Sequence, residues 1–375
     1  MKRSLRILSV LTALSLVAAA CSGAEEVVVV DDGGNEMTQV FFILDWVPKG
    51  QTAPFFVALD KGFWAERGLA VQMTRGYGSG DTSDRIGIGE GDYGFASAGV
   101  VMNKISQGLP LQEIGSIAGY DPVAAYIDPA AGVTSPEDMI GLKGAVDAGD
   151  GNDNTFRAWA PSVGIAYDDI DWQYTDGANI TSIASGQAHF VMDWITNLPE
   201  WWLADPPIVP DTQWVGFDIG GYGSGLIAQP DTVKNEPETT KAFVEGVMEG
   251  FKYVIEGGTA AHQEAIDILF KYNPEIAEQP NAAEFHLGNL QLFLTLMLSD
   301  EVREDGLGYY GDAKVATTVD FMNKFLIEGP DVTAAQAFGT TVEKGQFKIA
   351  DFDGALDSLS TVLGRPNPLL PYVSK

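Results

Sequence analysis

Short apolar runs alternate with longer amphipathic stretches along most of the chain. Residues 40–44 and 190–193 are examples of the short runs, and residues 238–256 form one of the long stretches. Short apolar runs bounded by Gly and Asp predict strands, whereas apolar positions recurring every three or four residues predict helices. The alternation of the two predicts an α/β fold.

The pattern also predicts where the individual elements lie. The predicted strands are residues 40–44, 71–74, 93–96, 113–118, 144–146, 171–175, 190–193 and 226–228. The predicted helices are residues 53–67, 82–89, 102–107, 155–163, 180–185, 238–256, 260–272, 281–298 and 314–326. A chain of 375 residues is long for one hydrophobic core and suits two lobes. A glycine-led turn that leads into a strand occurs at 89–96 and again at 186–191, as two related lobes would produce.

The first twenty-one residues differ from the rest of the chain. Three basic residues open the sequence, residues 7–20 are apolar, and small residues precede Cys21, the one cysteine. This pattern predicts a signal peptide over residues 1–20 that is cut so that the chain begins at a lipidated Cys21. Ala18 stands where lipoprotein signals usually carry Leu, so an ordinary signal peptide with a chance cysteine is the alternative.

Residues 21–37 are rich in acidic residues and glycine, and this composition predicts a flexible tether. The tether would hold the folded part off the membrane. Together with the signal peptide and the lipidated Cys21, this predicts a protein on the extracytoplasmic side, lipid-anchored to the cell membrane. After the signal, no run is apolar and long enough to cross a bilayer.

The balance of charged residues excludes some partners. The chain carries 52 acidic and 22 basic residues, a formal net charge of −30. This charge repels phosphates and anionic lipids, so we expect no nucleic-acid partner and anchoring by the acyl chain alone. The acidity itself is interpreted as solubility in a demanding habitat. The single cysteine leaves no disulfide and no thiolate metal site.

Enzyme chemistry is not indicated. His189, His262 and His286 are far apart in sequence and form no metal-binding spacing. No Gly-x-Ser-x-Gly motif is present, and the glycine-rich residues 76–80 lack the Gly-Lys-Ser/Thr ending of a phosphate loop. We therefore predict a protein that binds without catalysis, metal or cofactor.

Gly, Asp and aromatic residues recur directly after several predicted strands. Ligands of open α/β sheets bind beyond the carboxyl ends of the strands, where helix N-termini offer free amide groups. The candidate ligand-binding residues at these strand ends are Asp45, Trp46, Tyr77, Gly78, Ser79, Gly80, Asp81, Ser97, Tyr120, Asp121, Asp150, Asn152, Asp193, Trp194 and Tyr222.

Several motifs resemble a known family. The segment Leu44-Asp45-Trp46-Val47-Pro48, followed by residues 58–69, resembles the opening of solute-binding proteins of ABC importers. The similar branch is the one for thiamine-pyrimidine precursors, nitrate, sulfonate and taurine. Further landmarks that resemble this group are residues 89–96, 108–110, 134–144 and 186–193, so that the resemblance covers about 42–256.

The resemblance implies a type II periplasmic-binding fold, in which two α/β lobes are joined by two crossover strands and a ligand lies in the cleft. It places the crossovers near 119–125 and 216–226. Lobe one is then 38–122 together with 223–375, and lobe two is 123–222. It also implies a monomer that closes on its ligand and docks on an ABC permease. Related eukaryotic pyrimidine synthases use a histidine and a cysteine cluster, which this chain lacks.

Two kinds of ligand fit the candidate residues. An anion such as nitrate, taurine or another organosulfonate would use helix N-termini, but Lys49 and Arg75 are the only bases close by. An amino-substituted aromatic heterocycle fits better, because rings can stack on aromatic side chains and carboxylates accept hydrogen bonds from amino groups. The proposed stacking residues are Trp46, Tyr77, Tyr120, Trp194 and Tyr222, the acceptors Asp45, Asp121 and Asp193, and the backbone donors Gly78, Ser79 and Gly80.

The sequence therefore predicts binding of a thiamine-related pyrimidine or a similar ring, such as a flavin precursor. The alternatives are the same importer role for an anion, or a sensor or cell-surface enzyme built on the same fold.

Overall fold

The computed structural model describes residues 28–30, 34, 36–175 and 179–373. The predicted signal peptide, Cys21 and most of the predicted tether lie outside these residues. The last part of the tether differs from the expectation. Val28–Val30 (β1) pairs antiparallel with the start of the next strand, Glu36–Ile43 (β2). The run of four valines that precedes residue 31 is therefore partly used as a strand.

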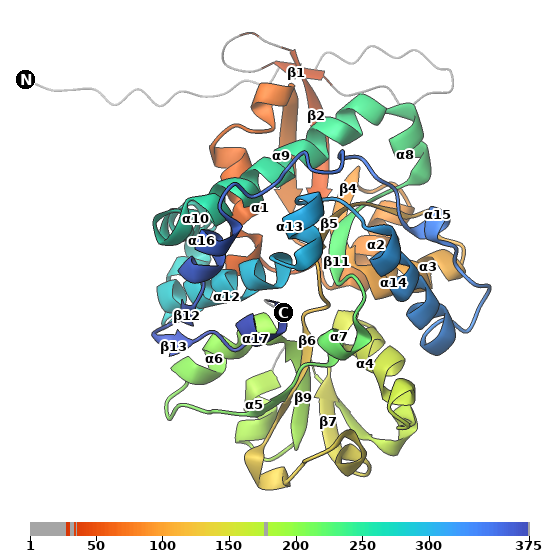
Figure 1. Cartoon of the computed structure of the whole chain (residues 1–375), viewed down its shortest axis with the longest axis vertical. Coiled ribbons are helices and arrows are strands. Elements are labelled where there is room, and N and C mark those ends of the chain that lie inside the picture. The colour runs from red at the N-terminus through yellow and green to blue at the C-terminus, as the bar shows by residue number, and fades with distance from the viewer. Residues whose placement is uncertain (1–27, 31–33, 35, 176–178, 374–375) are drawn as a thin grey trace, which may run out of the picture.

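The chain folds into two lobes, each built on its own sheet (Figure 1). In the larger sheet the strands follow the order β3, β2, β4, β11, β5, with β1 on the outer end of β2. β3 and β4 run parallel to β2, and β11 runs antiparallel to both of its neighbours. The remaining bounds in this sheet are Leu69–Thr74 (β3), Tyr93–Ser97 (β4), Gln112–Ala118 (β5) and Ser224–Ala228 (β11).

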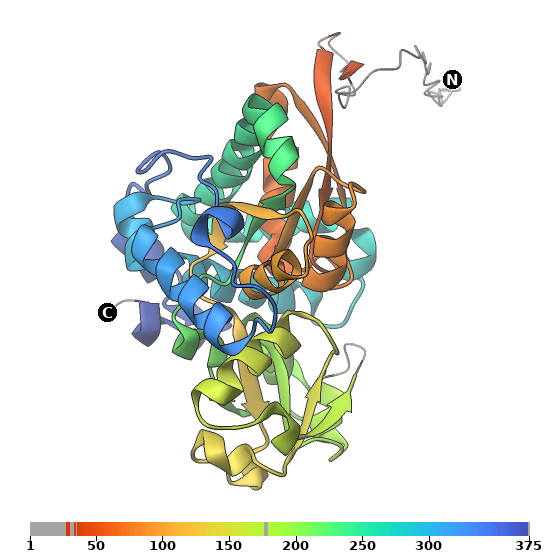
Figure 2. The ribbon, with the colours of Figure 1, turned by 90° about the vertical axis from the view of Figure 1, so that its right-hand side faces the viewer.

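The smaller sheet repeats this order as β8, β7, β9, β6, β10. Its bounds are Val123–Ile127 (β6), Lys143–Val146 (β7), Asp171–Tyr174 (β8), Phe190–Trp194 (β9) and Asp211–Gln213 (β10). β4 and β9, the two strands that follow the similar glycine-led turns, hold the same middle position in their sheets. The weak internal similarity thus corresponds to a repeated topology, and Figure 2 shows the two lobes one above the other.

Helices cover both sheets. In the larger lobe they are Ala53–Asp60 (α1), Ser79–Gly87 (α2), Ala98–Ser106 (α3), Pro230–Asn235 (α8), Pro237–Glu256 (α9), Gly258–Tyr272 (α10), Pro274–Ala277 (α11), Ala282–Met297 (α12), Asp300–Asp305 (α13), Asp312–Phe325 (α14), Ala334–Ala337 (α15), Phe352–Ser358 (α16) and Leu370–Val373 (α17). In the smaller lobe they are Gly151–Ser162 (α4), Asn179–Ala184 (α5), Leu198–Leu203 (α6) and Val215–Ile219 (α7). A short hairpin, Thr361–Val362 (β12) and Arg365–Pro366 (β13), precedes α17.

The core of the larger lobe is aromatic. Phe42, near the end of β2, makes edge-to-face contacts with Phe55 and Phe243, whose ring centroids each lie 5.1 Å away. Trp64 stacks on Phe243 and donates its indole N–H to the carbonyl of that residue. Buried aromatic pairs of this kind hold α1 and α9 against the sheet. None of the helices in the described part of the chain is both long and apolar enough to span a membrane.

Two predicted helices have different bounds because the chain turns elsewhere. The helix predicted over 53–67 ends at Asp60, since Gly62 takes a left-handed conformation (φ 78°) and the chain resumes as a single 3₁₀ turn at Ala65–Arg67. The helix predicted over 82–89 begins earlier, at Ser79. Ser79, Gly80 and Asp81, expected in a loop, therefore form the first turn of α2.

The helices predicted over 102–107 and 155–163 also begin about one turn earlier than expected. α3 starts at Ala98 directly after β4, and α4 starts at Gly151 with the Asp150 side chain as its cap. As a result, α2 and α4 begin where the two lobes face each other.

The two connections between the lobes run side by side. Gly223, before β11, donates its N–H to the carbonyl of Ala118 at the end of β5 (3.0 Å). A Cβ at Gly216 would lie 2.0 Å from the carbonyl oxygen of Asp121, and one at Gly223 would lie 2.3 Å from that of Tyr120. Only glycine allows the backbones of the two connections to approach this closely.

Candidate ligand-binding site

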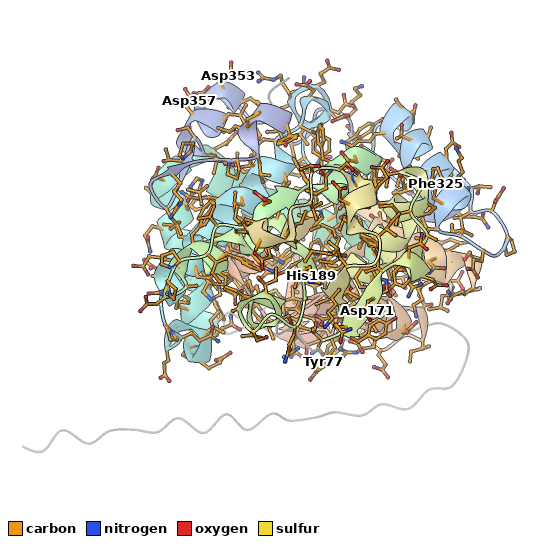
Figure 3. The ribbon with its side chains drawn as sticks, turned by 90° about the horizontal axis from the view of Figure 1, so that it is seen from below. Tyr77, Asp171, His189, Phe325, Asp353 and Asp357 are labelled. Carbon is orange, nitrogen blue, oxygen red and sulfur yellow. The ribbon has the colours of Figure 1, made fainter. Side chains whose placement is uncertain are left out.

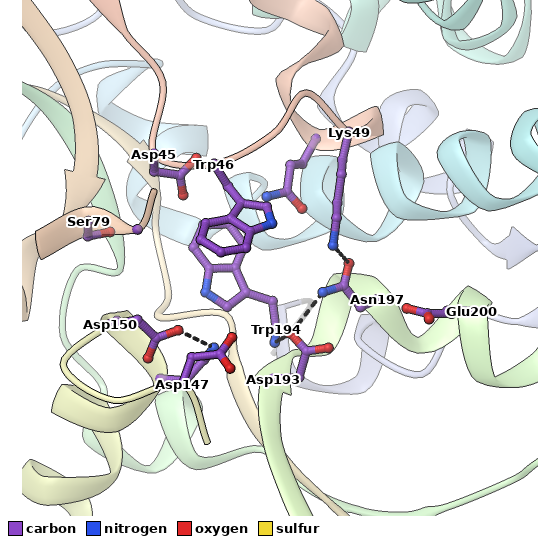
Figure 4. Close-up of a pocket in the computed structure, with 14 residues that line it drawn as sticks. Asp45, Trp46, Lys49, Ser79, Asp147, Asp150, Asp193, Trp194, Asn197 and Glu200 are labelled. Carbon is purple, nitrogen blue, oxygen red and sulfur yellow. Dashed lines mark hydrogen bonds between the residues drawn. The ribbon is translucent and has the colours of Figure 1, made fainter. Parts of the chain in front are cut away.

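A cavity opens between the lobes, at the ends of β2, β7 and β9 (Figure 4). It has a volume of about 700 Å³, including the space at its mouth. Its lining residues are Asp45, Trp46, Lys49, Gln51, Gly78, Ser79, Asp147, Asp150, Gly151, Asn152, Asp193, Trp194, Asn197 and Glu200. We call this space the acidic chamber, because five of these side chains are carboxylic acids and a single one, Lys49, is a base.

Asp45 is the acid of the larger lobe. It follows β2, its side chain is only 4% exposed, and its Oδ1 accepts no hydrogen bond within the described residues. Burial raises the pKa of Asp45 to about 7, although its backbone hydrogen bonds and the charge of Lys49 oppose the shift. A buried acceptor without a donor is costly unless a ligand supplies the donor.

Asp150 is the central acid of the smaller lobe. Its Oδ1 accepts from the N–H of Asp153 and its Oδ2 from the amide of Asn152, each at 2.9 Å. Burial raises the pKa of Asp150 to about 8. The Oδ1 of Asn152 is buried and accepts no hydrogen bond in the described part of the chain. It is a second free acceptor in the chamber wall.

Asp193 at the end of β9 is held by its neighbours. Its Oδ1 accepts from the N–H of Trp194 (2.7 Å) and from the amide of Asn197 (2.8 Å). Burial raises the pKa of Asp193, and the charge of Lys49 opposes this effect. The carboxyl group therefore keeps a fixed orientation toward the chamber.

Polar side chains from both lobes meet behind the chamber. Asn289 of α12 donates to the Oδ1 of Asn197 (3.1 Å) and to the carbonyl of Thr196 (3.0 Å). Its own Oδ1 accepts from the N–H of Gln51 (2.7 Å). These bonds tie the segment after β9 to the larger lobe and close one rim of the chamber.

One indole comes from each lobe. Trp46 follows Asp45, and Trp194 ends β9; Figure 4 shows both rings at the chamber wall. The Trp194 ring is parallel to that of Phe293, with an interplanar angle of 4° and a centroid distance of 6.4 Å. The guanidinium of Arg75 lies 5.7 Å from the Trp46 ring. The two indoles give a flat ligand an aromatic surface on each side of the cleft.

The structure brings together eight of the fifteen residues predicted to bind ligand. These are Asp45, Trp46, Gly78, Ser79, Asp150, Asn152, Asp193 and Trp194. The other seven do not line the acidic chamber. They are Tyr77, Gly80, Asp81, Ser97, Tyr120, Asp121 and Tyr222.

Four of these seven lie just outside the chamber. Tyr77 is 66% exposed and stacks against Arg75, and Figure 3 places it at the edge of the molecule. Asp81 accepts a hydrogen bond from the N–H of Tyr77. Ser97 lies beneath the wall and donates its N–H to the Oγ of Ser79. Gly80 lies against the backbone of Gly149, since a Cβ at position 80 would be 3.2 Å from the carbonyl oxygen of Gly149.

The remaining three residues belong to the connections between the lobes. Asp121 is buried and accepts hydrogen bonds from the N–H of Val123 and the hydroxyl of Thr155, each at 2.9 Å. The rings of Tyr120 and Tyr222 lie 3.7 Å and 5.4 Å from the ammonium group of Lys314 on α14. Asp121 thus contacts α4 and the two tyrosines contact α14, and none of the three lines the chamber.

Six lining residues were missed as ligand-binding candidates. They are Lys49, Gln51, Asp147, Gly151, Asn197 and Glu200. Asp147 directly follows a predicted strand, so the rule that selected Asp193 also applies to it. Asn197 and Glu200 follow the predicted strand 190–193 within seven residues. Gln51 carries no comparable signal in the sequence.

The described residues contain no cluster of three or more His, Cys, Asp or Glu side chains arranged to hold a metal ion. None of the three histidines lines the chamber. Burial lowers the pKa of His262 and of His286 to about 4. His189 accepts a hydrogen bond from the backbone N–H of Lys143, at the start of β7, whereas the chamber lies at the other end of this strand.

Two sheets of the same strand order, joined by paired connections around a cavity, define the periplasmic-binding-protein fold. A solved structure of this class, the alkanesulfonate-binding protein SsuA from Xanthomonas axonopodis pv. citri bound to MOPS, superposes with a TM-score of 0.59. It is 14% identical, and the match covers 80% of this chain and 98% of that protein. The model of the NMT1/THI5-like family matches residues 49–261, and the chain belongs to this family.

Relatives in sequence include both binding proteins and synthases. The formylaminopyrimidine-binding protein of Halalkalibacterium halodurans is 22% identical over 306 residues, covering 79% of this chain and 87% of that protein. A 4-amino-5-hydroxymethyl-2-methylpyrimidine phosphate synthase of Legionella pneumophila is 20% identical over 306 residues, covering 78% of this chain and 94% of the synthase. The match to the Saccharomyces cerevisiae synthase THI11, 26% identical over 106 residues, spans 28% of this chain and only 31% of the yeast protein.

Proposed function

We propose that this protein binds a small amino-substituted aromatic heterocycle, such as a thiamine-related pyrimidine, in the acidic chamber and releases it unchanged. The observation that carries the proposal is the composition of the chamber wall: five carboxylic acids, two indoles and one lysine. Carboxylates accept hydrogen bonds from amino groups, and these charge-assisted bonds are roughly twice as strong as neutral ones. The indoles provide the stacking surfaces for the ring.

The free acceptors favour this ligand over an anion. The Oδ1 atoms of Asp45 and Asn152 are buried and need donors, which an aminopyrimidine has and nitrate or an alkanesulfonate without an amino group lacks. An anion would in addition lie among Asp45, Asp150 and Asp193, with Lys49 as its one cation. The cost of burying like charges together therefore opposes an anionic ligand. The pyrimidine named for the Halalkalibacterium relative is in keeping with this choice.

Calorimetric titration with two groups of compounds tests the proposal. Formylaminopyrimidine and 4-amino-5-hydroxymethyl-2-methylpyrimidine should bind much more tightly than taurine, ethanesulfonate and nitrate. Asp45→Asn should weaken pyrimidine binding about tenfold or more, because one charge-assisted bond contributes roughly 1.5–3 kcal/mol. Asp128→Asn, on the far side of the smaller lobe, is the matched control and should bind as the unaltered protein does. Binding of taurine or nitrate without the pyrimidines would overturn the assignment.

Some relatives are named synthases, so conversion of the ligand is the alternative to simple binding. We propose that the protein does not convert its ligand, because none of the three histidines reaches the chamber and the one cysteine lies at position 21. Mass spectrometry of the bound pyrimidine after prolonged incubation should recover it unaltered. Recovery of a phosphorylated or otherwise changed pyrimidine would show catalysis.

We further propose that the protein is an extracytoplasmic lipoprotein that delivers its ligand to an ABC permease. The support for this is the N-terminal pattern ending at Cys21. In cells producing the full chain, Cys21→Ser should abolish incorporation of a labelled fatty acid and release the protein from the membrane fraction. Loss of the protein should abolish uptake of the labelled pyrimidine. Unchanged uptake, with altered transcription instead, would favour the sensor alternative.

A further inference from the structure

A second cavity adjoins the acidic chamber. The two share Trp46, Lys49 and Glu200 in their walls, so they lie next to each other in the cleft between the lobes. The second cavity encloses about 1250 Å³, including its wide mouth. We call it the side chamber.

The side chamber differs in chemistry from the acidic chamber. Its walls beyond the shared residues include Leu203 and Ala204 at the end of α6, and Pro280 and Phe285 from the larger lobe. Among the described residues that line it, only Lys49 and Glu200 are charged, and both lie at the border with the acidic chamber. An apolar group is therefore expected to be stabilised in this space by removal from water.

Contacts between the lobes hold the side chamber in shape. The amide of Asn281 donates to the carbonyl of Leu203 (3.3 Å), which joins the start of α12 to the end of α6. Nearer the border, the ammonium group of Lys49 lies 3.1 Å from the Oδ1 of Asn197 and 5.8 Å from the centroid of the Phe285 ring. The chamber thus lies between two points at which the lobes touch.

We infer that the natural solute is larger than a single aminopyrimidine ring and carries an apolar, preferably aromatic, substituent that occupies the side chamber. This inference rests on the proposed function, since the amino-substituted ring would lie in the acidic chamber. Trp46 lines both spaces, so its indole would cover the bond that joins the two halves of the ligand. A second anionic group does not suit the side chamber, because the single cation Lys49 is matched there by Glu200.

Two probes of the same charge test the inference. The first is 4-amino-5-aminomethyl-2-methylpyrimidine, and the second is the same compound with a benzyl group on its exocyclic aminomethyl nitrogen. The benzylated probe should bind about tenfold more tightly to the unaltered protein, since its phenyl ring is buried against apolar walls. Tryptophan fluorescence or calorimetry measures both constants.

Variants of the side-chamber wall should affect only the larger probe. Phe285→Ala and Leu203→Ser should remove most of the advantage of the benzylated probe and leave the affinity for the small probe unchanged. Phe325→Ala on α14 is the matched control, because Phe325 is likewise half-buried in the larger lobe and lines neither chamber. This control should leave both affinities as they are.

The outcomes separate the two claims. If the small probe binds and the benzylated probe binds equally or more weakly, the inference is overturned while the proposed function stands. The inference is also overturned if the benzylated probe binds more tightly but Phe285→Ala and Leu203→Ser leave its advantage intact. If neither probe binds, the proposed function fails, and the inference fails with it.

Discussion

Lys49 of the larger lobe donates a hydrogen bond to Asn197 of the smaller lobe, with 3.1 Å between Nζ and Oδ1 (Figure 4). The same Asn197 donates to Asp193, and Lys49 opposes the rise of the pKa of both Asp193 and Asp45. One side chain thus links the lobes and offsets part of the acidic charge of the chamber.

Lys49→Met should change the preference of the protein for ligand charge. The substitution removes the one cation among the described residues of the chamber wall, so the ratio of aminopyrimidine affinity to sulfonate affinity should rise by about tenfold. Asn197→Ala removes the bond between the lobes but keeps the charge, and should weaken all ligands without changing the ratio. Competition titrations measure this ratio. A fall of the ratio in Lys49→Met would mean that Lys49 contributes more to binding of the aminopyrimidine than to binding of the sulfonate, and would contradict its assignment.

Ligand affinity should rise with pH between about 6 and 8.5. Burial raises the pKa of Asp45 to about 7 and of Asp150 to about 8 in the free protein. An amino-substituted ring needs the ionised acids as acceptors, so binding at pH 7 should release protons. Calorimetry in buffers of different ionisation enthalpy measures this release. It should decrease in Asp150→Asn, and an affinity that falls over this pH range would contradict the assignment of the acids as acceptors.

Asp150→Asn should stabilise the ligand-free protein while weakening its binding. The folded-state pKa of Asp150 is raised to about 8, so the stability that the neutral acid contributes is complete below its unfolded pKa and lost as the pH rises to about 8. At pH 8.5 the free energy of unfolding of the variant should therefore exceed that of the unaltered protein by several kcal/mol, since each unit of pKa shift corresponds to about 1.4 kcal/mol. The difference should shrink toward pH 4. Urea titrations at several pH values measure it.

Asp351→Asn is the control for that experiment. Asp351 caps α16 as Asp150 caps α4, since each accepts a hydrogen bond from a backbone N–H three residues on. Asp351 lies outside the acidic chamber, so its substitution should show no such pH dependence. Equal behaviour of the two variants would mean that the effect of Asp150→Asn comes from helix capping.

Lys314→Met should destabilise the protein, and a second substitution should reverse the effect. Burial lowers the pKa of Lys314, and the nearby charge of Glu301, 3.5 Å away, opposes this shift. Removing the cation leaves Glu301 beside Tyr120 and Tyr222 without a countercharge, which should cost about 1 kcal/mol. The double variant Lys314→Met/Glu301→Gln should recover most of this loss in thermal or urea unfolding. Lys324→Met, on the exposed side of the same helix, should have little effect, and a double variant as unstable as the single one would refute the pairing.

The strand and helix pattern could be predicted because it is local. β4 and β9 are buried along their full length and read as apolar runs between glycine-led turns. The acids Asp45 and Asp193 were found because each stands directly at a strand end. The starts of α2, α3 and α4 were predicted late. The first turns of α2 and α4 contain Gly, Ser, Asp and Asn, which look like loop in the sequence, and α4 is capped by the Asp150 side chain.

The family motifs and the residue types at the strand ends depend only on neighbours along the chain. Both could therefore be recognised from the sequence alone. Tertiary structure alone decided which strand ends face the cavity. β11 lies more than a hundred residues after β5 in the chain, yet the two strands pair in the sheet. This pairing makes Tyr120, Asp121 and Tyr222 parts of the connection between the lobes. The tertiary structure also brings Gln51, Asn197 and Asn289 together across the cleft. Such contacts join residues far apart in sequence, and no local pattern of polarity encodes which of them will meet.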